Sequence, residues 1–215
     1  FVSRLSLTLM TGVRARNLDE LLRGLKELPD SVIYHHTHRF LVQHQHLVPE
    51  PPNDFAFWVS QSLSDRAVGE ALASVNTVRF ASMRELRDAL IKAVERNTDP
   101  QNSLQNVHRG QEFYFMRSVA FLVPTNYQAW DLVEFKDALG RISVHSLYHH
   151  IFEGRLHLPG GMDDFANWLK NSLEETALAK KLSKMDPYTH TLEGMRSKII
   201  GFVEHRISEL SNVPS

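Results

Sequence analysis

The chain has 215 residues, of which 42% are hydrophobic and 23% are charged, a composition sufficient for the core of one ordinary domain or of two small ones. Because 24 Lys and Arg residues balance 25 Asp and Glu residues, the formal net charge of −1 argues against nucleic acid or a membrane as the partner. The absence of cysteine excludes a disulfide scaffold, a thiolate metal site and a cysteine nucleophile. No stretch approaches the roughly 18 apolar residues of a membrane span, and the start lacks a signal-peptide pattern, so we expect a soluble chain trimmed before Phe1.

Apolar residues alternate in two segments, which predicts one short β-strand at the start of each half of the chain. Thr-Gly and Pro-Thr-Asn, which favour turns, follow the two segments and should end the strands. The alternating residues are Phe1, Leu5, Leu7 and Leu9 in the first segment and Phe113, Phe115, Val119, Phe121 and Val123 in the second.

Helices are predicted to follow each strand, and residues that favour helix N-caps mark their starts. Five helices are expected in the first half, and the prolines at 49, 51 and 52 must end the second of them. The last helix of each half should run to about Arg96 and about Leu210, respectively. The predicted starts are Asn17, Ser31, Asn53 or Asp54, Ser64 and Ser82 in the first half, with Asp131, Ser143 and about Thr191 among the matching starts in the second.

The two halves of the sequence are similar to each other. Residues 11–36 align without a gap on residues 125–150, and both segments end in Tyr-His-His. Asn-Asp-Phe-Ala-Phe-Trp at 53–58 matches Asp-Asp-Phe-Ala-Asn-Trp at 163–168. We therefore predict a mainly α fold made by tandem duplication of a unit of about 100 residues, with about five helices after a short possible β-strand. Residues 1–96 form the first repeat, 97–112 a linker and 113–215 the second repeat, and such units usually pack about a pseudo-twofold axis.

Histidine carries the chemical signal of this sequence, because twelve are present and the second predicted helix of each repeat holds an adjacent pair. On a helical wheel, His36 and His150 share a face with apolar residues and should point into the core. His35 and His149 should lie on a wetter face. Two interpretations of the inward imidazoles stay open: a structural group satisfied by hydrogen bonds, or part of a metal or acid–base centre.

Carboxylates accompany these histidines. Glu153 follows His149 by one helical turn, but its counterpart in the first repeat is Arg39, so we expect at most one composite metal site. Asp54 and Asp164 recur before the aromatic residues of the third helix, where each can cap the helix or support such a centre. The candidate ligand-binding residues are His35, His36, His149, His150, Asp54 and Asp164, and the candidate metal ligands are His36, His150 and Glu153.

Several catalytic signatures are absent from the sequence. It contains no phosphate-binding glycine loop, no nucleophile elbow and no closed spacing of metal ligands, so we expect no cofactor and keep a divalent transition metal as the alternative. The favoured hypothesis is a non-catalytic helical module that binds a protein or small ligand in the cleft between the two repeats. The alternative is a metal-dependent enzyme, such as a hydrolase, with a histidine–carboxylate site between the repeats. A third hypothesis is pH sensing by buried imidazoles.

Long motifs carry a resemblance to a known family. They are SVIYHHTHRFLVQHQHLVPEPPNDFAFWV (31–59), LVPT (122–125), SLYHHIFEGRL (146–156), DDFANWL (163–169) and MDPYTHTLEGMRSKIIGFVE (185–204). The chain resembles, over nearly its whole length, an uncharacterised bacterial family with a domain of unknown function and tandem YHxxHRFL and NDFAxW motifs. The resemblance implies a prokaryotic source and a cytoplasmic setting, and it assigns no activity and no catalytic residue.

Overall fold

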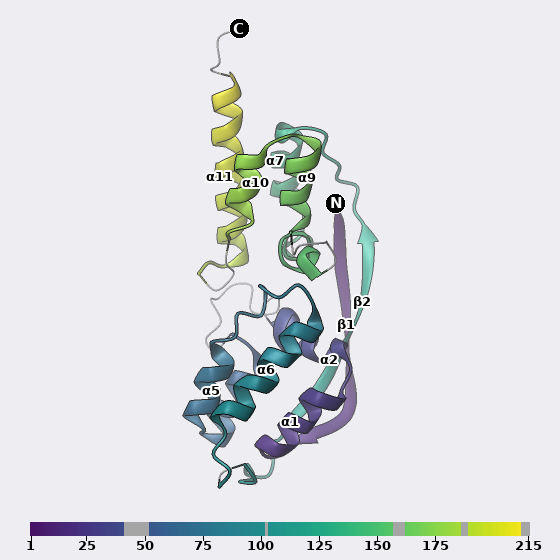
Figure 1. Ribbon diagram of the computed structural model, residues 1–215. Helices are drawn as coiled ribbons and strands as arrows, with labels where there is room; N and C mark the ends of the chain where they lie inside the picture. Colours follow the sequence, from purple (N-terminus) through teal and green to yellow (C-terminus); the bar gives the residue numbers. More distant parts are fainter. Residues whose placement is uncertain (41–51, 102, 157–161, 186–188, 212–215) are drawn as a thin grey trace. The chain divides into compact units, whose positions relative to one another are not determined.

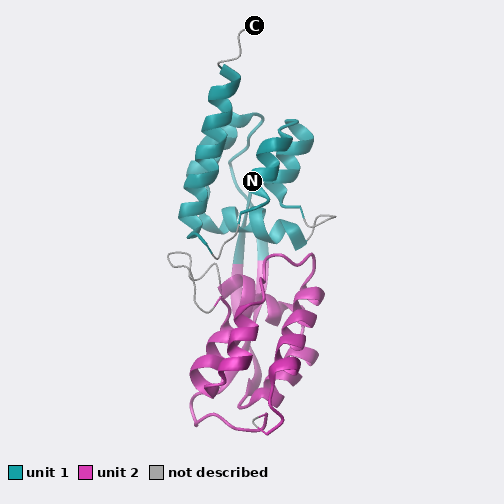
Figure 2. Cartoon of the chain, turned by 60° about the vertical axis from the view of Figure 1, so that its left-hand side comes forward, with its two compact units in different colours: residues 1–5, 45–48, 121–215 teal, residues 6–44, 49–120 magenta. Residues whose placement is uncertain are grey.

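The computed structural model describes residues 1–40, 52–101, 103–156, 162–185 and 189–211. These residues form a mainly helical fold with one two-stranded antiparallel sheet, and this confirms that the fold is mainly α, as predicted (Figure 1). They divide into two compact units (Figure 2). Unit 1 joins Phe1–Leu5 to the part of the chain from Phe121 onward, and unit 2 holds the described residues between Ser6 and Ala120. No helix of the described residues is long and apolar enough to cross a membrane.

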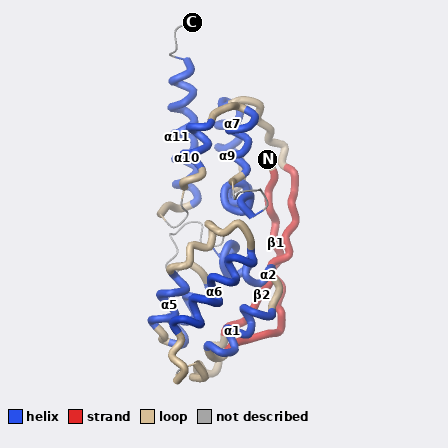
Figure 3. Tube along the Cα trace, in the orientation of Figure 1, coloured by secondary structure: helices blue, strands red, loops and turns tan. Residues whose placement is uncertain are grey.

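The two strands, β1 (Val2–Ala15) and β2 (Phe113–Pro124), lie side by side (Figure 3). Thr125 donates its main-chain N–H to the Phe1 carbonyl, and Thr11 donates its hydroxyl to the Phe115 carbonyl, which fixes an antiparallel register. β2 matches the predicted segment to within one residue, whereas β1 is longer than the sequence predicts. β1 continues through the Thr-Gly pair at which a turn was expected, because Gly12 adopts a φ of +79° that glycine tolerates without strain.

The core of each unit contains strand residues from the other half of the sequence. Phe1, before β1, contacts the rings of Phe135 and Phe165 in unit 1. Phe113 and Phe115 of β2 are buried in the core of unit 2. Neither set of helices therefore completes its core with residues from its own half alone.

The helices of unit 2 start close to the predicted caps. The side chains of Asn17, Asn53 and Ser82 accept hydrogen bonds from the main-chain N–H groups three residues later, as expected. Asp65, rather than Ser64, caps the fourth predicted helix. In chain order the elements are α1 (Leu18–Glu27), α2 (Asp30–Tyr34), the π-helix η1 (His35–Arg39), α4 (Asp54–Trp58), the π-helix η2 (Val59–Leu63), α5 (Arg66–Ala73) and α6 (Met83–Asn97).

Unit 1 follows the same order of elements. Asp131 and Ser143 cap its first two helices as predicted, and its last helix begins at Leu192, one residue after the expected start. The elements are α7 (Leu132–Arg141), α8 (Val144–Tyr148), the π-helix η3 (His149–Glu153), the 3₁₀ turn η4 (Gly154–Leu156), α9 (Asp164–Ser172), α10 (Thr176–Leu182) and α11 (Leu192–Ser211).

The helix that carries the histidine pair is not a regular α-helix in either unit. It begins at Asp30 rather than Ser31 in unit 2, and after one α-helical segment it continues as η1, while η3 follows α8 in unit 1. The predicted end of this helix in unit 2, at the proline cluster, falls largely outside the described residues. π-Helical turns are rare and frequently occur at functional sites, which directs attention to the histidines.

Candidate functional site

His36 is held between a carboxylate and a strand of unit 2. Its Nδ1 lies 2.7 Å from Asp54 Oδ2, and the main-chain N–H of Met116 in β2 donates to its Nε2 over 2.9 Å. Because a main-chain N–H can only donate, Nε2 must accept and the ring proton lies on Nδ1, where it is donated to Asp54. The imidazole is 3% exposed, so its predicted inward orientation is confirmed.

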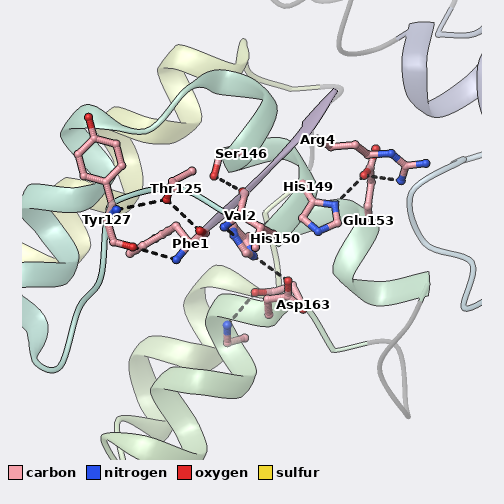
Figure 4. Close-up of polar contacts among 12 residues, drawn as sticks. Phe1, Val2, Arg4, Thr125, Tyr127, Ser146, His149, His150, Glu153 and Asp163 are labelled. Atoms are coloured by element: carbon pink, nitrogen blue, oxygen red, sulfur yellow. Dashed lines mark hydrogen bonds and ion pairs between the residues drawn. The ribbon is translucent and has the colours of Figure 1, made fainter. Parts of the chain in front are cut away.

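His150 makes the same set of contacts in unit 1. Its Nδ1 lies 2.7 Å from Asp164 Oδ2. The main-chain N–H of Val2 in β1 donates to its Nε2 over 3.0 Å, as Figure 4 shows. This imidazole is buried, again as predicted. Val2 is separated from Met116 by the same number of residues that separates His36 from His150, so the two histidines bind matching positions of the two strands.

These contacts restrict the chemistry of both imidazoles. A metal ligand or a general base needs a ring nitrogen with an available lone pair. In His36 and His150 the acceptor nitrogen is occupied by a main-chain N–H and the other nitrogen donates to a carboxylate. The geometry favours the structural interpretation, in which each histidine attaches a strand to the helices of its unit.

His35 and His149 are 6% and 5% exposed, and the expectation that they lie on a wetter face is wrong. His35 Nδ1 lies 2.9 Å from the Ser118 hydroxyl of β2, and burial, followed by the electrostatic interaction with the neighbouring His36 ring, lowers the pKa of His35 to about 4. The wheel analysis failed because it treated each helix as if its outer face met water, whereas a strand covers that face. His35 is therefore neutral at physiological pH.

His149 belongs to a buried charged group that the first repeat lacks. Its Nδ1 lies 2.8 Å from Glu153 Oε2, and the same oxygen accepts a 2.7 Å hydrogen bond from Arg4 Nη1 (Figure 4). The Glu153 side chain is only 2% exposed. The predicted proximity of Glu153 to His149 is thus present, but Arg4 satisfies the carboxylate, which weakens it as a metal ligand.

Asp54 and Asp164 do not cap the third helix. That role belongs to the preceding residues, because Asn53 accepts from Ala56 N and Asp163 accepts from Ala166 N. Asp54 and Asp164 are the first helical residues, and their carboxylates are free to receive the histidine protons. The sequence therefore identified the carboxylates that bind the histidines, but it did not decide which residue of each neighbouring pair caps the helix.

Asp163 is fully buried, and burial raises its pKa to about 6. Oδ1 makes the capping bond, whereas Oδ2 has no hydrogen-bond partner within the described part of the chain, and an Arg155 nitrogen lies 3.8 Å away. Its counterpart Asn53 uses its amide group to donate to the Leu72 carbonyl over 3.1 Å.

A pocket of about 230 Å³ opens beside the histidine–aspartate pair of unit 1. Its wall is mainly aromatic, and Trp168 lines it as a half-buried side chain. The lining residues are Phe1, Ala129, Phe135, His150, Asp164, Phe165 and Trp168. Sequence analysis missed this pocket because Phe1 is far from the other lining residues along the chain.

The matching place in unit 2 is filled by the ring of Phe113. Its centroid lies 4.7 Å from that of His36, 5.3 Å from that of Phe55 and 5.6 Å from that of Trp58. These three residues align with His150, Phe165 and Trp168, which line the open pocket of unit 1.

The predicted metal trio of His36, His150 and Glu153 is divided between the units, because His36 lies in unit 2 and the other two lie in unit 1. Among the described residues, a different set has ligand atoms within 4.8 Å of one another: His149, His150 and Asp164. In that set, however, His150 and Asp164 already share a hydrogen bond.

The fold and these contacts define a mainly helical protein with two equivalent histidine–aspartate pairs, each of which binds one strand of a two-stranded sheet. The chain belongs to a family of unknown function, DUF5752, whose model matches residues 1–204. It is similar to the solved structure of OrfY from Thermoproteus tenax, with 29% sequence identity, a TM-score of 0.82, and coverage of 97% of this chain and 94% of that chain. Comparison with curated proteins found no match. The expected family of unknown function is confirmed, whereas these matches give no support to a bacterial source, because Thermoproteus tenax is an archaeon.

Proposed function

We propose that the protein is a non-catalytic helical binding module and that the aromatic pocket of unit 1 binds a small ligand. One observation carries this proposal. The pocket places an aromatic wall, in which the Phe135 ring centroid lies 5.2 Å from that of Phe165 and 5.1 Å from that of Trp168, beside the half-buried carboxylate of Asp164. A pocket of about 230 Å³ suits a small molecule rather than a folded partner.

Duplication explains why the two arrangements are so similar. Arg87 donates to the carbonyl of Leu25, and Arg196 donates to the carbonyl of the aligned Leu139. Non-glycine residues with positive φ also occur at aligned places, at Ser64 and at Glu174. Such local matches support descent from one ancestral unit, while the predicted pseudo-twofold axis and inter-repeat cleft stay predictions from the sequence.

The non-catalytic part of the proposal rests on His150. It is the only imidazole among the described residues that line the pocket, and its Nε2 accepts the Val2 N–H, so it has no lone pair to take a proton from a substrate. The lining also lacks serine, threonine and lysine, so it offers no side-chain nucleophile of those types.

The test is a titration with phenol, anisole and cyclohexanol, followed in ¹H–¹⁵N NMR spectra of the whole chain. We expect saturable shifts centred on the amides of Ala129 and Phe165. Ala129→Leu should abolish them because the larger side chain fills the pocket, whereas Ala177→Leu, the same change at an exposed position of α10, should leave them intact. Absence of saturable shifts at these amides for all three probes would refute the proposed site.

The cluster of His149, His150 and Asp164 favours a second candidate function, that of a metal-dependent enzyme such as a hydrolase, because its ligand atoms lie within 4.8 Å of one another. Elemental analysis of protein purified without a histidine tag separates the two proposals. We expect less than about a tenth of an equivalent of any transition metal. A stoichiometric ion that is lost in the His149→Ala variant would instead support the enzyme.

A further inference from the structure

We infer that unit 2 carries an interaction surface, the β1 edge, through which two copies of the chain pair reversibly. The β1 edge consists of residues Ser6–Val13 of strand β1. It belongs to unit 2, so the inference does not depend on ligand binding in the pocket of unit 1. It uses three observations: main-chain groups without a strand partner, exposed apolar side chains, and the absence of charge.

The β1 edge has no neighbouring strand on one side. The sheet of the described residues has two strands, so β1 pairs with β2 alone (Figure 3). In an antiparallel pair, the main-chain groups of alternate residues face away from the neighbouring strand. Within the described part of the chain, no helix or loop forms a hydrogen bond with Ser6–Val13. Such a row of main-chain donors and acceptors is a template for pairing with another strand.

The other strand of unit 2 is covered by helices. The main-chain N–H of Met116 in β2 donates to His36 Nε2, and the Ser118 hydroxyl lies 2.9 Å from His35 Nδ1. In unit 2, therefore, β2 is held by the helices and β1 is open. A strand contact at this unit joins β1 of one copy to β1 of another. Contact between identical surfaces about a twofold axis closes at a dimer and does not continue into a fibre.

The side chains of the β1 edge favour a second copy as the partner. Leu7, Leu9 and Met10 are 58%, 38% and 71% exposed, and pairing would remove part of this apolar surface from water. Natural edge strands are commonly protected by charged residues or proline, but Ser6–Val13 has the sequence SLTLMTGV and contains neither. Two copies therefore meet without like-charge repulsion, whereas a strongly charged partner finds no opposite charge on this segment.

The size of the β1 edge sets the strength of the contact. Eight residues span about 26 Å at a rise of about 3.3 Å per residue, and a sheet with its side chains is about 10 Å thick. Each copy therefore buries about 260 Å² in an edge-to-edge contact. A stable specific interface buries about 800 Å² per partner. The edge therefore supports a weak dimer that forms at high concentration.

Analytical ultracentrifugation of the whole chain, from about 10 μM to about 1 mM, measures this association. We expect the average mass to rise with concentration from that of one chain, 24.7 kDa, towards that of a dimer. A chain that stays monomeric over the whole range would overturn the inference.

A matched pair of substitutions tests whether the β1 edge makes the contact. Met10→Lys should raise the dissociation constant of the dimer at least about tenfold, because it brings two like charges together in an uncharged contact. Met10 is 71% exposed, so its replacement should leave the fold of the single chain intact. Leu104→Lys, at a residue that is 68% exposed and lies outside β1, should leave the dissociation constant unchanged. Equal effects of the two variants would place the contact elsewhere and refute the inference.

Disulfide cross-linking tests the antiparallel pairing of β1 with itself. The natural chain has no cysteine, so each single-cysteine variant carries one thiol. Among variants along the β1 edge, those at Leu9 and Met10, near its middle, should cross-link most, because in an antiparallel pair of identical strands only residues near the twofold axis lie opposite themselves. Arg84→Cys, at an exposed position of α6, should cross-link little. Equal cross-linking at Arg84 and at the middle of the edge, or uniform cross-linking along the edge, would overturn the inference.

Discussion

Replacing Asp163 by asparagine should stabilise the protein at neutral pH and leave its stability at low pH nearly unchanged. Asp163 is fully buried, its Oδ1 caps α9 through a 2.7 Å bond from Ala166 N, and its Oδ2 accepts no hydrogen bond from the residues that the structure describes. The charge of Arg155, 3.8 Å away, offsets only part of the cost of burying the carboxylate, because burial still raises its pKa. Asparagine keeps the capping oxygen and removes the charge, and Asn53 shows that an amide is accommodated at the aligned position.

The magnitude follows from the raised pKa. The carboxyl loses its proton near pH 3.8 when unperturbed and near pH 6 in the folded protein. Between these values the folded state binds more protons than the unfolded state, so the free energy of unfolding falls as the pH rises through this window, and the loss persists above pH 6. A difference of about two pH units corresponds to about 3 kcal/mol.

The assay is urea denaturation of both proteins at several pH values from about 4 to about 7.5. The advantage of Asp163→Asn over the natural chain should grow across that range by about 3 kcal/mol. The reverse change in unit 2, Asn53→Asp, should create a comparable loss of stability at neutral pH, because it also removes the donor to the Leu72 carbonyl. Parallel curves for the natural chain and Asp163→Asn would refute the reasoning.

Two further pairs of substitutions test the packing that supports the pocket and the strands. Arg4→Met should destabilise the protein by about 3 kcal/mol, because it removes the guanidinium group that pairs with the buried Glu153 carboxylate. Adding Glu153→Gln to the same chain should recover part of this loss. A loss below about 1 kcal/mol for Arg4→Met in urea denaturation would contradict this prediction. Gly24→Ala should cost about 1–3 kcal/mol, because the new Cβ would lie 2.1 Å from Phe115 Cζ, whereas Gly201→Ala, where the Cβ meets open space in α11, should stabilise by about 1 kcal/mol. Similar thermal shifts for the two glycine variants would show that the strand does not pack on α1 as described.

Local sequence signals predicted much of the helical structure. Asn17, Asp131 and Ser82 act as caps because a short polar side chain followed by an amphipathic segment determines a helix start through nearby contacts alone. The inward orientation of His36 and His150 was also predictable, since it depends on the position of apolar neighbours on the same helix.

Features that depend on distant segments were not predictable in the same way. The burial of His35 depends on Ser118, and the burial of Glu153 depends on Arg4, and each pair is separated by a large part of the chain. At the histidines the helices form π-helical turns, whose hydrogen bonds span one residue more than those of an α-helix. A search for apolar residues with the α-helical period of 3.6 residues cannot reveal such turns. The pocket escaped notice because it exists only when Phe1 is placed beside α7 and α9.

The protonation of His36 and His150 tests the central claim most directly, because the account assigns both imidazoles to strand attachment rather than catalysis. Long-range ¹H–¹⁵N NMR spectra of the imidazole rings report which nitrogen carries the proton. The account predicts that both rings carry it on Nδ1 at neutral pH, with Nε2 unprotonated and hydrogen-bonded to the main chain. A proton on Nε2 in either ring, or rapid exchange of the Met116 and Val2 amides with solvent, would contradict it.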